Sequence, residues 1–257
     1  MTDNIIFDDL RQKKRYDVCY SSHIGRREEQ QDSGYLAVND NEVVAVLCDG
    51  MGGIEGGRIA SHVAVDKFVE CYGQSNGQAW METAADIVDD MVFALKNSEG
   101  QRLGAGTTLV AVNIDDSMMS WVSVGDSRVY IIRDEEILQV TTDHNYYLQL
   151  NHQLNTGEIN KSQYYLECED GEALISFIGM GGLVLKDVSN EPLNLLRGDT
   201  ILLCTDGIYR TLSDEIILAS IIRNSTAEEI IGEIDSSIMI ADKKYQDNYS
   251  AIVIRIN

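Results

Sequence analysis

The sequence of 257 residues contains one proline, Pro192, and no tract rich in proline or serine. Because such residues often build the linkers between domains, their absence favours one continuous domain. No uninterrupted apolar stretch approaches the roughly 18 residues that a membrane-spanning helix needs. The amino terminus lacks the basic, apolar and small-residue segments of an export signal. We therefore expect a cytoplasmic protein without a membrane partner.

Cysteine is sparse, and its five copies are scattered without a C-x-x-C pair. An odd, dispersed set argues against a disulfide framework and a zinc site, and it is typical of a reducing compartment. Cys48 and Cys204 stand inside apolar runs, where cysteine usually packs as a small core residue.

Basic residues are outnumbered, with 20 Lys and Arg against 42 Asp and Glu and a formal net charge of -22. A nucleic-acid surface needs a basic stripe, so we expect no nucleic-acid partner. Acidity by itself often serves only solubility. It gains a functional meaning where carboxylates converge.

The motifs of several enzyme classes are missing. The glycines from position 50 onward do not fit G-x-G-x-x-G, because Glu55 stands where the third glycine belongs. No G-x-x-x-x-G-K-[ST], H-E-x-x-H or G-x-S-x-G occurs either. His62 and His144 could act as acids, but without a partner motif a surface or loop position is the simpler interpretation.

Apolar patterning predicts blocks of strands separated by helices. Strand-like runs cover 16–23, 34–38, 43–48, 107–114, 118–124, 128–133, 201–205 and 249–256. Helical periodicity covers 57–72, 79–96, 214–223 and 227–239. This order favours an antiparallel α+β architecture over alternating βαβ units. The segment 141–182 has weak periodicity, which fits either a mobile subdomain over a site or a surface insertion.

The run 43–48 ends on Asp49 and is followed by five glycines within eight residues. The run predicts a strand covered on both faces. Glycine permits positive φ and a close approach of the backbone to a ligand. For this stretch alone, a tight turn with a solvated aspartate is the plainer interpretation.

Four more aspartates stand at predicted strand ends: Asp32, Asp126, Asp206 and Asp247. Each by itself could simply form a turn. Together with Asp49 they predict a shared oxygen-rich centre that suits a hard cation such as magnesium or manganese. Converging carboxylates also raise one another's pKa, and a bound cation relieves that repulsion. Two ions that share a carboxylate could activate water and hold a phosphoryl oxygen.

Read in order, a series of motifs resembles the bacterial branch of the type 2C (PPM) family of metal-dependent serine/threonine protein phosphatases. The motifs are Gly25-x-Arg27-x-x-Gln30-Gln31-Asp32, Asp49-Gly50-Met51-Gly52-Gly53, Gly106-Thr107-Thr108, Gly125-Asp126-Ser127-Arg128, Asp206-Gly207 and Asp247-Asn248. Each is weak alone, but the ordered set is specific. The resemblance implies a four-layer α-β-β-α sandwich, in which helices flank two packed antiparallel sheets. It also implies one catalytic domain over 16–257, with a flap at about 141–182, after a short polar extension over 1–15.

The resemblance assigns metal-binding roles to matching positions. Asp49 would bridge two Mn²⁺ or Mg²⁺ ions, and Gly50 would offer its carbonyl to one of them. Asp206 and Asp247 would bind the other ion. Asp126 matches an aspartate that can bind a third, looser ion in bacterial members.

Further positions match residues around the metals. Asp32, Gln31 and Asn248 would form the outer shell, and Arg27 would grip the substrate phosphate with its guanidinium fork. Three departures stand out: Gln31 replaces a common glutamate, Gln30 replaces asparagine, and Met51 stands where eukaryotic members place a histidine.

The activity implied is hydrolysis of phosphoserine and phosphothreonine in proteins by a hydroxide that bridges the two ions, opposing a protein kinase. The expected partners are a phosphorylated protein and a cognate kinase. The alternative is a catalytically silent family member that binds phosphoproteins as a regulator, although the metal aspartates are intact. A phosphatase dedicated to one small protein would share the chemistry and differ only in substrate.

Overall fold

The computed structural model describes residues 15–74 and 80–257. Nearly all of the expected amino-terminal extension, 1–15, therefore lies outside the described residues. Within these two ranges, no helix is both long and apolar enough to cross a membrane.

The described strands alternate with turns and helices along the whole chain. They are β1 (Tyr16–His23), β2 (Asp32–Val38), β3 (Glu42–Met51), β4 (Gly106–Thr107), β5 (Leu109–Asp115), β6 (Met118–Val124), β7 (Arg128–Arg133), β8 (Glu136–Gln139), β9 (Asp187–Val188), β10 (Leu193–Asn194), β11 (Thr200–Cys204) and β12 (Tyr249–Ile256). The helices are α1 (Gly53–Gly73), α2 (Trp80–Phe93), α3 (Tyr146–Thr156), α4 (Lys161–Glu167), the 3₁₀ turn η1 (Cys168–Asp170), α5 (Asp206–Tyr209), α6 (Asp214–Ile222) and α7 (Ala227–Ala241).

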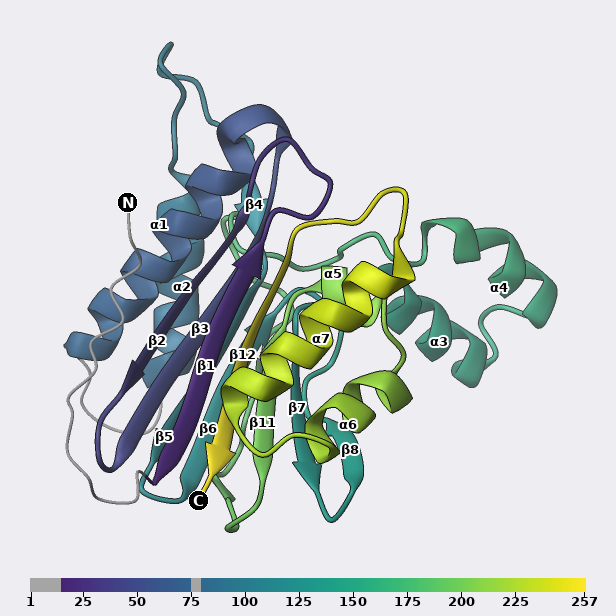
Figure 1. Ribbon diagram of the computed structural model, residues 1–257. Helices are drawn as coiled ribbons and strands as arrows, with labels where there is room; N and C mark the ends of the chain where they lie inside the picture. Colours follow the sequence, from purple (N-terminus) through teal and green to yellow (C-terminus); the bar gives the residue numbers. More distant parts are fainter. Residues whose placement is uncertain (1–14, 75–79) are drawn as a thin grey trace.

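Antiparallel pairing gathers these strands into two sheets (Figure 1). One sheet has the order β1-β12-β11-β7-β8. The other has the order β10-β6-β5-β3-β2, with β4 beside β3 and β9 beside β6. The expected antiparallel α+β class is confirmed.

Three apolar clusters hold four layers together. Val44 and Val46 of β3 point to one side, where they pack with α1 and α2. Val43 and Leu47 of the same strand point to the other side and pack between the two sheets. A third cluster lies between β11, β12 and helices α6 and α7. The alternation along β3 explains its uninterrupted apolar run, because both faces of the strand are covered.

The segment 141–182 is more regular than its sequence suggested. It contains α3, α4 and η1, which project from one side of the sheets (Figure 1). The helices have 11 and 7 residues, too short for apolar periodicity to stand out. Their limits follow local turn chemistry: Gly157 ends α3 with φ of 78°, and Asn160 begins α4 in a capping box with Gln163.

Both ends of this segment are tied to the sheets. The backbone of His144 donates to the carbonyl of Gly125, beyond the end of β6. At the other end, Ile178 exchanges two backbone hydrogen bonds with Thr107 of β4. These attachments hold the segment beside the loops that follow β3 and β6.

The inter-sheet core supplies the first prediction. Leu203 of β11 is fully buried between the sheets. Leu203→Ala should lower the free energy of unfolding by about 2–5 kcal/mol, because it removes apolar contacts and leaves a cavity. Leu138→Ala is the matched control: Leu138 lies in the same sheet, is 63% exposed, and should change stability by less than about 0.5 kcal/mol. Urea denaturation measures both, and equal effects would contradict the layer assignment.

Candidate functional site

The expected aspartates meet at one edge of the two sheets. A cleft of about 970 Å³ opens there, and Asp49, Asp126, Asp206 and Asp247 line it. Asp49 lies near the end of β3, Asp126 follows β6, Asp206 begins α5 just after β11, and Asp247 precedes β12. Strand ends from both sheets therefore bring together residues that are far apart in the sequence.

Asp49 is held through its backbone. Its amide donates to the hydroxyl of Thr108 at 2.9 Å, and its carbonyl accepts from the hydroxyl of Thr107 at 2.8 Å. The Thr108 hydroxyl also contacts that of Ser127 at 2.7 Å. The Gly106-Thr107-Thr108 and Gly125-Asp126-Ser127-Arg128 motifs thus fix the position of Asp49 and leave its carboxylate facing the cleft.

Asp32 is buried directly opposite Asp49 in the β2–β3 ladder. Its Oδ2 accepts hydrogen bonds from Thr205 at 2.9 Å and from Ser250 at 2.8 Å. Its Oδ1 is buried without a hydrogen-bond partner among the described residues. Because a buried oxygen without a partner is costly, this atom calls for a cation or an ordered water.

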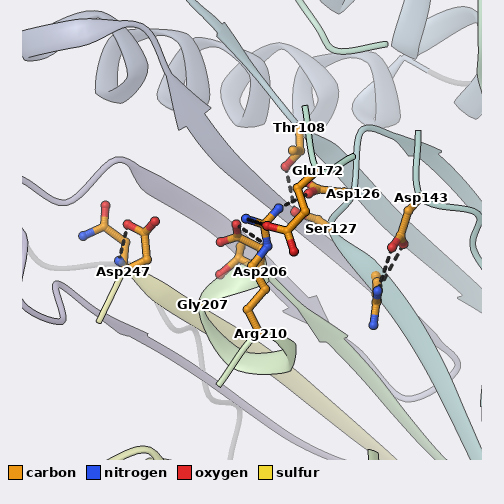
Figure 2. Close-up of polar contacts among 12 residues, drawn as sticks. Thr108, Asp126, Ser127, Asp143, Glu172, Asp206, Gly207, Arg210 and Asp247 are labelled. Carbon is orange, nitrogen blue, oxygen red and sulfur yellow. Dashed lines mark hydrogen bonds and ion pairs between the residues drawn. The ribbon is translucent and has the colours of Figure 1, made fainter. Parts of the chain in front are cut away.

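Arg210 pairs with two of the cleft aspartates (Figure 2). Its Nε lies 3.1 Å from Oδ2 of Asp206, and its Nη2 lies 3.0 Å from Oδ2 of Asp126. Its Nη1 lies 2.7 Å from Glu172 of the segment 141–182. The second oxygen of Asp206, Oδ1, is buried and has no hydrogen-bond partner in the described part of the chain.

Asp247 faces the cleft from the opposite side and pairs with Arg27, whose Nη2 lies 2.6 Å from Oδ2. The expected phosphate-binding arginine therefore contacts an expected metal ligand. The neighbouring Asn248 accepts from the backbone amide of Gln31 at 2.9 Å and donates to two carbonyls of the loop between β1 and β2. Asn248 thus holds the loop that carries Arg27 and Gln31 against the start of β12.

The glycine at position 50 is required by packing. A Cβ at Gly50 would lie 2.1 Å from the carbonyl oxygen of Gly57 in α1 and 2.7 Å from that of Gln31. The end of β3 therefore touches the first turns of α1 backbone to backbone. The helix begins at Gly53, after Gly52 takes φ of 130°, and both glycines line the cleft.

Burial and crowding change the acidity of the cluster. Burial raises the pKa of Asp32 to about 7, and the carboxylates of Asp206 and Asp247 add to the rise. Burial also raises the pKa of Asp206 to about 6, although Arg210 opposes it. The pKa of Asp49 lies well above its usual value because of burial and the neighbouring carboxylates. The cluster therefore stabilises added positive charge.

The donor set fits a hard divalent cation. It consists of carboxylate oxygens, with Gly50 beside them in the lining of the cleft. The Oδ1 atoms of Asp32 and Asp206 are buried without a hydrogen-bond partner among the described residues, and burial together with the neighbouring carboxylates makes ionisation of Asp49 unfavourable. Across the described ranges, no group of three or more carboxylate, histidine or cysteine side chains stands close enough together to hold one ion. Arg27 occupies an oxygen of Asp247, so a cation bound to that oxygen would displace this pair, whereas Arg210 contacts Oδ2 of Asp206 and leaves Oδ1 without a partner among the described residues.

Neither candidate histidine faces the cleft. Nδ1 of His62 on α1 lies 2.7 Å from Ser33 and 2.8 Å from the carbonyl of Arg58. His144 is buried beneath the turn that carries Asp126 and accepts from the amide of Gly125 at 3.2 Å. Burial lowers the pKa of His144, which favours the neutral ring that this contact needs. Both histidines support the scaffold.

Sequence reasoning missed Arg210 and Glu172. Arg210 stands four residues after Asp206, the spacing at which oppositely charged side chains meet on a helix, so a local signal was present. Glu172 had no such signal, because only the path of the segment 141–182 brings it to the cleft.

Comparison with known proteins identifies the family of this chain. Residues 20–229 match the family model described as Protein phosphatase 2C. The chain is 30% identical over 190 residues to the serine/threonine phosphatase stp of Listeria monocytogenes serotype 4b, which covers 71% of this chain and 73% of that relative.

Solved structures share the fold. The serine/threonine phosphatase of S. agalactiae superposes with a TM-score of 0.80 and 22% identity over 94% of this chain and all of that one (100%). The catalytic domain of the serine threonine protein phosphatase PstP, solved in complex with 2 manganese ions, superposes with a TM-score of 0.73 and 24% identity, covering 93% of this chain and 97% of that one.

Asp32 gives a prediction for the metal-free protein. Its pKa is raised from 3.8 to about 7, so the folded state holds a proton that the unfolded state has lost above about pH 4. This stabilisation is complete at low pH and is lost as pH rises through 7. Between pH 5 and 8 in chelator, the wild type should lose about 2 kcal/mol more unfolding free energy than Asp32→Asn.

Urea denaturation of both proteins at several pH values measures this difference. Asp86→Asn is the control, because Asp86 is an exposed carboxylate that pairs with Lys186 away from the cleft, and its stability curve should follow that of the wild type. Parallel stability curves for the wild type and Asp32→Asn would refute the raised pKa.

Proposed function

The chain belongs to the protein phosphatase 2C family, and on that premise we propose that it hydrolyses phosphoserine and phosphothreonine in proteins with the help of Mn²⁺ or Mg²⁺. The relatives named serine/threonine phosphatases support this reaction, and the PstP structure with manganese supports the metal. The substrate would be a phosphorylated protein supplied by a cognate protein kinase.

One observation carries the proposal: two buried carboxylate oxygens, which have no hydrogen-bond partner in the described part of the chain, lie in a cluster beside an open cleft that arginines line. A carboxylate cluster needs positive charge, and a phosphate ester needs positive charge around its oxygens. The same cleft therefore accommodates cations and a phosphorylated side chain together.

The proposed metal ligands are Asp49, the carbonyl of Gly50, Asp206 and Asp247. Asp32 acts from the outer shell through its free Oδ1, and Gln31 and Asn248 hold the surrounding loop. When bound, the ions supply an activated water and neutralise charge on the phosphoryl oxygens. Asp49 and Asp206 hold this positive charge at the base of the cleft, where burial strengthens the interaction.

Arg27 is the proposed phosphate-binding residue. Its side chain is 58% exposed at the rim of the cleft, and its guanidinium already contacts a carboxylate, an anion that, like a phosphate, offers negatively charged oxygens as acceptors. A substrate phosphate would take the place of Asp247 at Arg27, and Asp247 would turn to the metals. The amino terminus of α1, at Gly52 and Gly53, adds a favourable dipole along the cleft.

A cytoplasmic location belongs to the proposal as well. It is supported by the cysteines Cys19, Cys48, Cys71, Cys168 and Cys204, which are all free. The strong net negative charge of -22 supports the absence of a nucleic-acid partner.

The test of the proposed activity is hydrolysis of a phosphothreonine peptide with manganese and with chelator. The wild type should turn over only with manganese, and Asp206→Asn should retain less than about 1% of its rate, because a buried metal ligand is lost. Asp86→Asn is the matched control, since Asp86 lies on α2 and pairs with Lys186 away from the cleft. Its rate should equal that of the wild type.

Absence of turnover at every manganese concentration, in a folded wild-type protein, would contradict the enzyme proposal. It would favour the alternative of a silent phosphoprotein-binding regulator. Equal rates for the wild type and Asp206→Asn would retain the activity but reject the proposed ligand.

Arg27 is tested against its neighbour. Arg27→Ala should lower kcat/KM for the phosphopeptide on the order of 100-fold, the value of one charge-assisted contact of about 3 kcal/mol. Arg26→Ala is the control, because Arg26 pairs with the exposed Asp242 and should change kcat/KM less than about threefold. Manganese binding, followed by calorimetry, should persist in both variants. A larger loss of kcat/KM in Arg26→Ala than in Arg27→Ala would show that Arg26, and not Arg27, contacts the phosphate.

A further inference from the structure

The guanidinium of Arg210 lies among three carboxylates from separate parts of the chain. Asp206 begins α5, Asp126 follows β6, and Glu172 comes from the segment 141–182; their oxygens lie 3.1, 3.0 and 2.7 Å from Nε, Nη2 and Nη1. Figure 2 shows the three side chains around this one cation. Each edge nitrogen of the guanidinium therefore has its own carboxylate.

Three carboxylates around one positive charge are typical of a metal site, but here the positive charge belongs to Arg210. The side chains of Asp126 and Asp206 are 5% and 14% exposed, so their charges need a nearby positive charge. Arginine supplies it permanently, because the guanidinium does not lose its proton in proteins. A divalent ion bound to the same face of Asp126 would meet the guanidinium at close range and be repelled.

The two carboxylate oxygens of Asp206 have different contacts. Arg210, the residue just after α5, contacts Oδ2, whereas Oδ1 stays buried without a partner in the described residues. The ion pair therefore holds the carboxylate in one orientation and leaves a single oxygen for an ion in the centre. Asp126 differs, because Arg210 contacts its Oδ2 and neither of its oxygens is among the buried atoms left without a hydrogen-bond partner in the described residues.

We propose that Arg210 is a positioning residue that takes the place of a third divalent ion beside Asp126, so that the centre holds two ions. Arg210 also contacts Glu172, and this contact connects the segment 141–182 with the aspartates of the cleft. The inference rests on the proposed metal-dependent function, and it replaces the expectation that Asp126 can bind a third ion.

The test counts manganese ions bound per chain by equilibrium dialysis, independently of activity. The wild type and Asp126→Asn should both bind two, because Asp126 holds no ion. Arg210→Gln removes the charge and keeps a long polar side chain; it should bind three ions. Arg210→Gln combined with Asp126→Asn should return to two. Arg210→Lys, which keeps the charge, should remain at two.

Melting curves in chelator show whether each variant is folded before ions are counted. A wild type that binds three ions and loses one in Asp126→Asn would overturn the inference, and this comparison stands even if Arg210→Gln does not fold. A folded Arg210→Gln that binds only two ions would overturn it as well.

These outcomes are separate from failure of the proposed function. A wild type that binds no manganese and hydrolyses no phosphopeptide would reject the metal-dependent activity itself. A wild type that hydrolyses phosphopeptide with three bound ions would leave that activity intact and reject only the role of Arg210.

Discussion

Repulsion among carboxylates is the constraint on which the rest of this structure depends. Four aspartates line one cleft, and Asp32 lies buried behind them in the ladder opposite Asp49. Burial removes the water that would screen the charges of Asp32 and Asp49, so the pKa values of these two carboxyl groups rise. A fold that keeps them together must supply protons, arginines or metal ions. The carboxylate cluster therefore sets the chemistry of every group around it.

The surrounding scaffold is built to resist this repulsion. Thr107 and Thr108 hold the backbone of Asp49. Thr205 and Ser250 hold one oxygen of Asp32. Strand pairing within the two sheets fixes the strand ends that carry these residues. The hydroxyls of Thr107, Thr205 and Ser250 donate these hydrogen bonds and that of Thr108 accepts one, so all four act without adding charge. They fix the carboxylates in place while leaving single oxygens of Asp32 and Asp206 free of protein partners in the described ranges. Such preorganised oxygens are the feature that a cation site requires.

Two arginines form ion pairs with these carboxylates in different ways. Arg27 is exposed at the rim and pairs with Asp247, so its contact is one that a phosphate could exchange. Arg210 is only 35% exposed and contacts three carboxylates, so its contact is structural. The first arginine suits substrate binding and the second suits positioning. Glu172 extends the second contact to the segment 141–182, which connects the centre with the helices that project beside the sheets.

The sequence by itself determined the fold class, most strands and the positions of the five aspartates. Those signals are local: apolar alternation marks strands such as β3, and an acidic residue beside glycine or serine marks a strand end. Only the tertiary structure decided the pairing of the charges. The Arg27–Asp247 and Arg210–Asp126 contacts join residues 220 and 84 positions apart, and Glu172 reaches the cleft through short helices with little periodicity. The geometry of these ion pairs depends on how strand ends from the two sheets meet. No short stretch of the sequence carries that information, because the paired residues lie far apart along the chain.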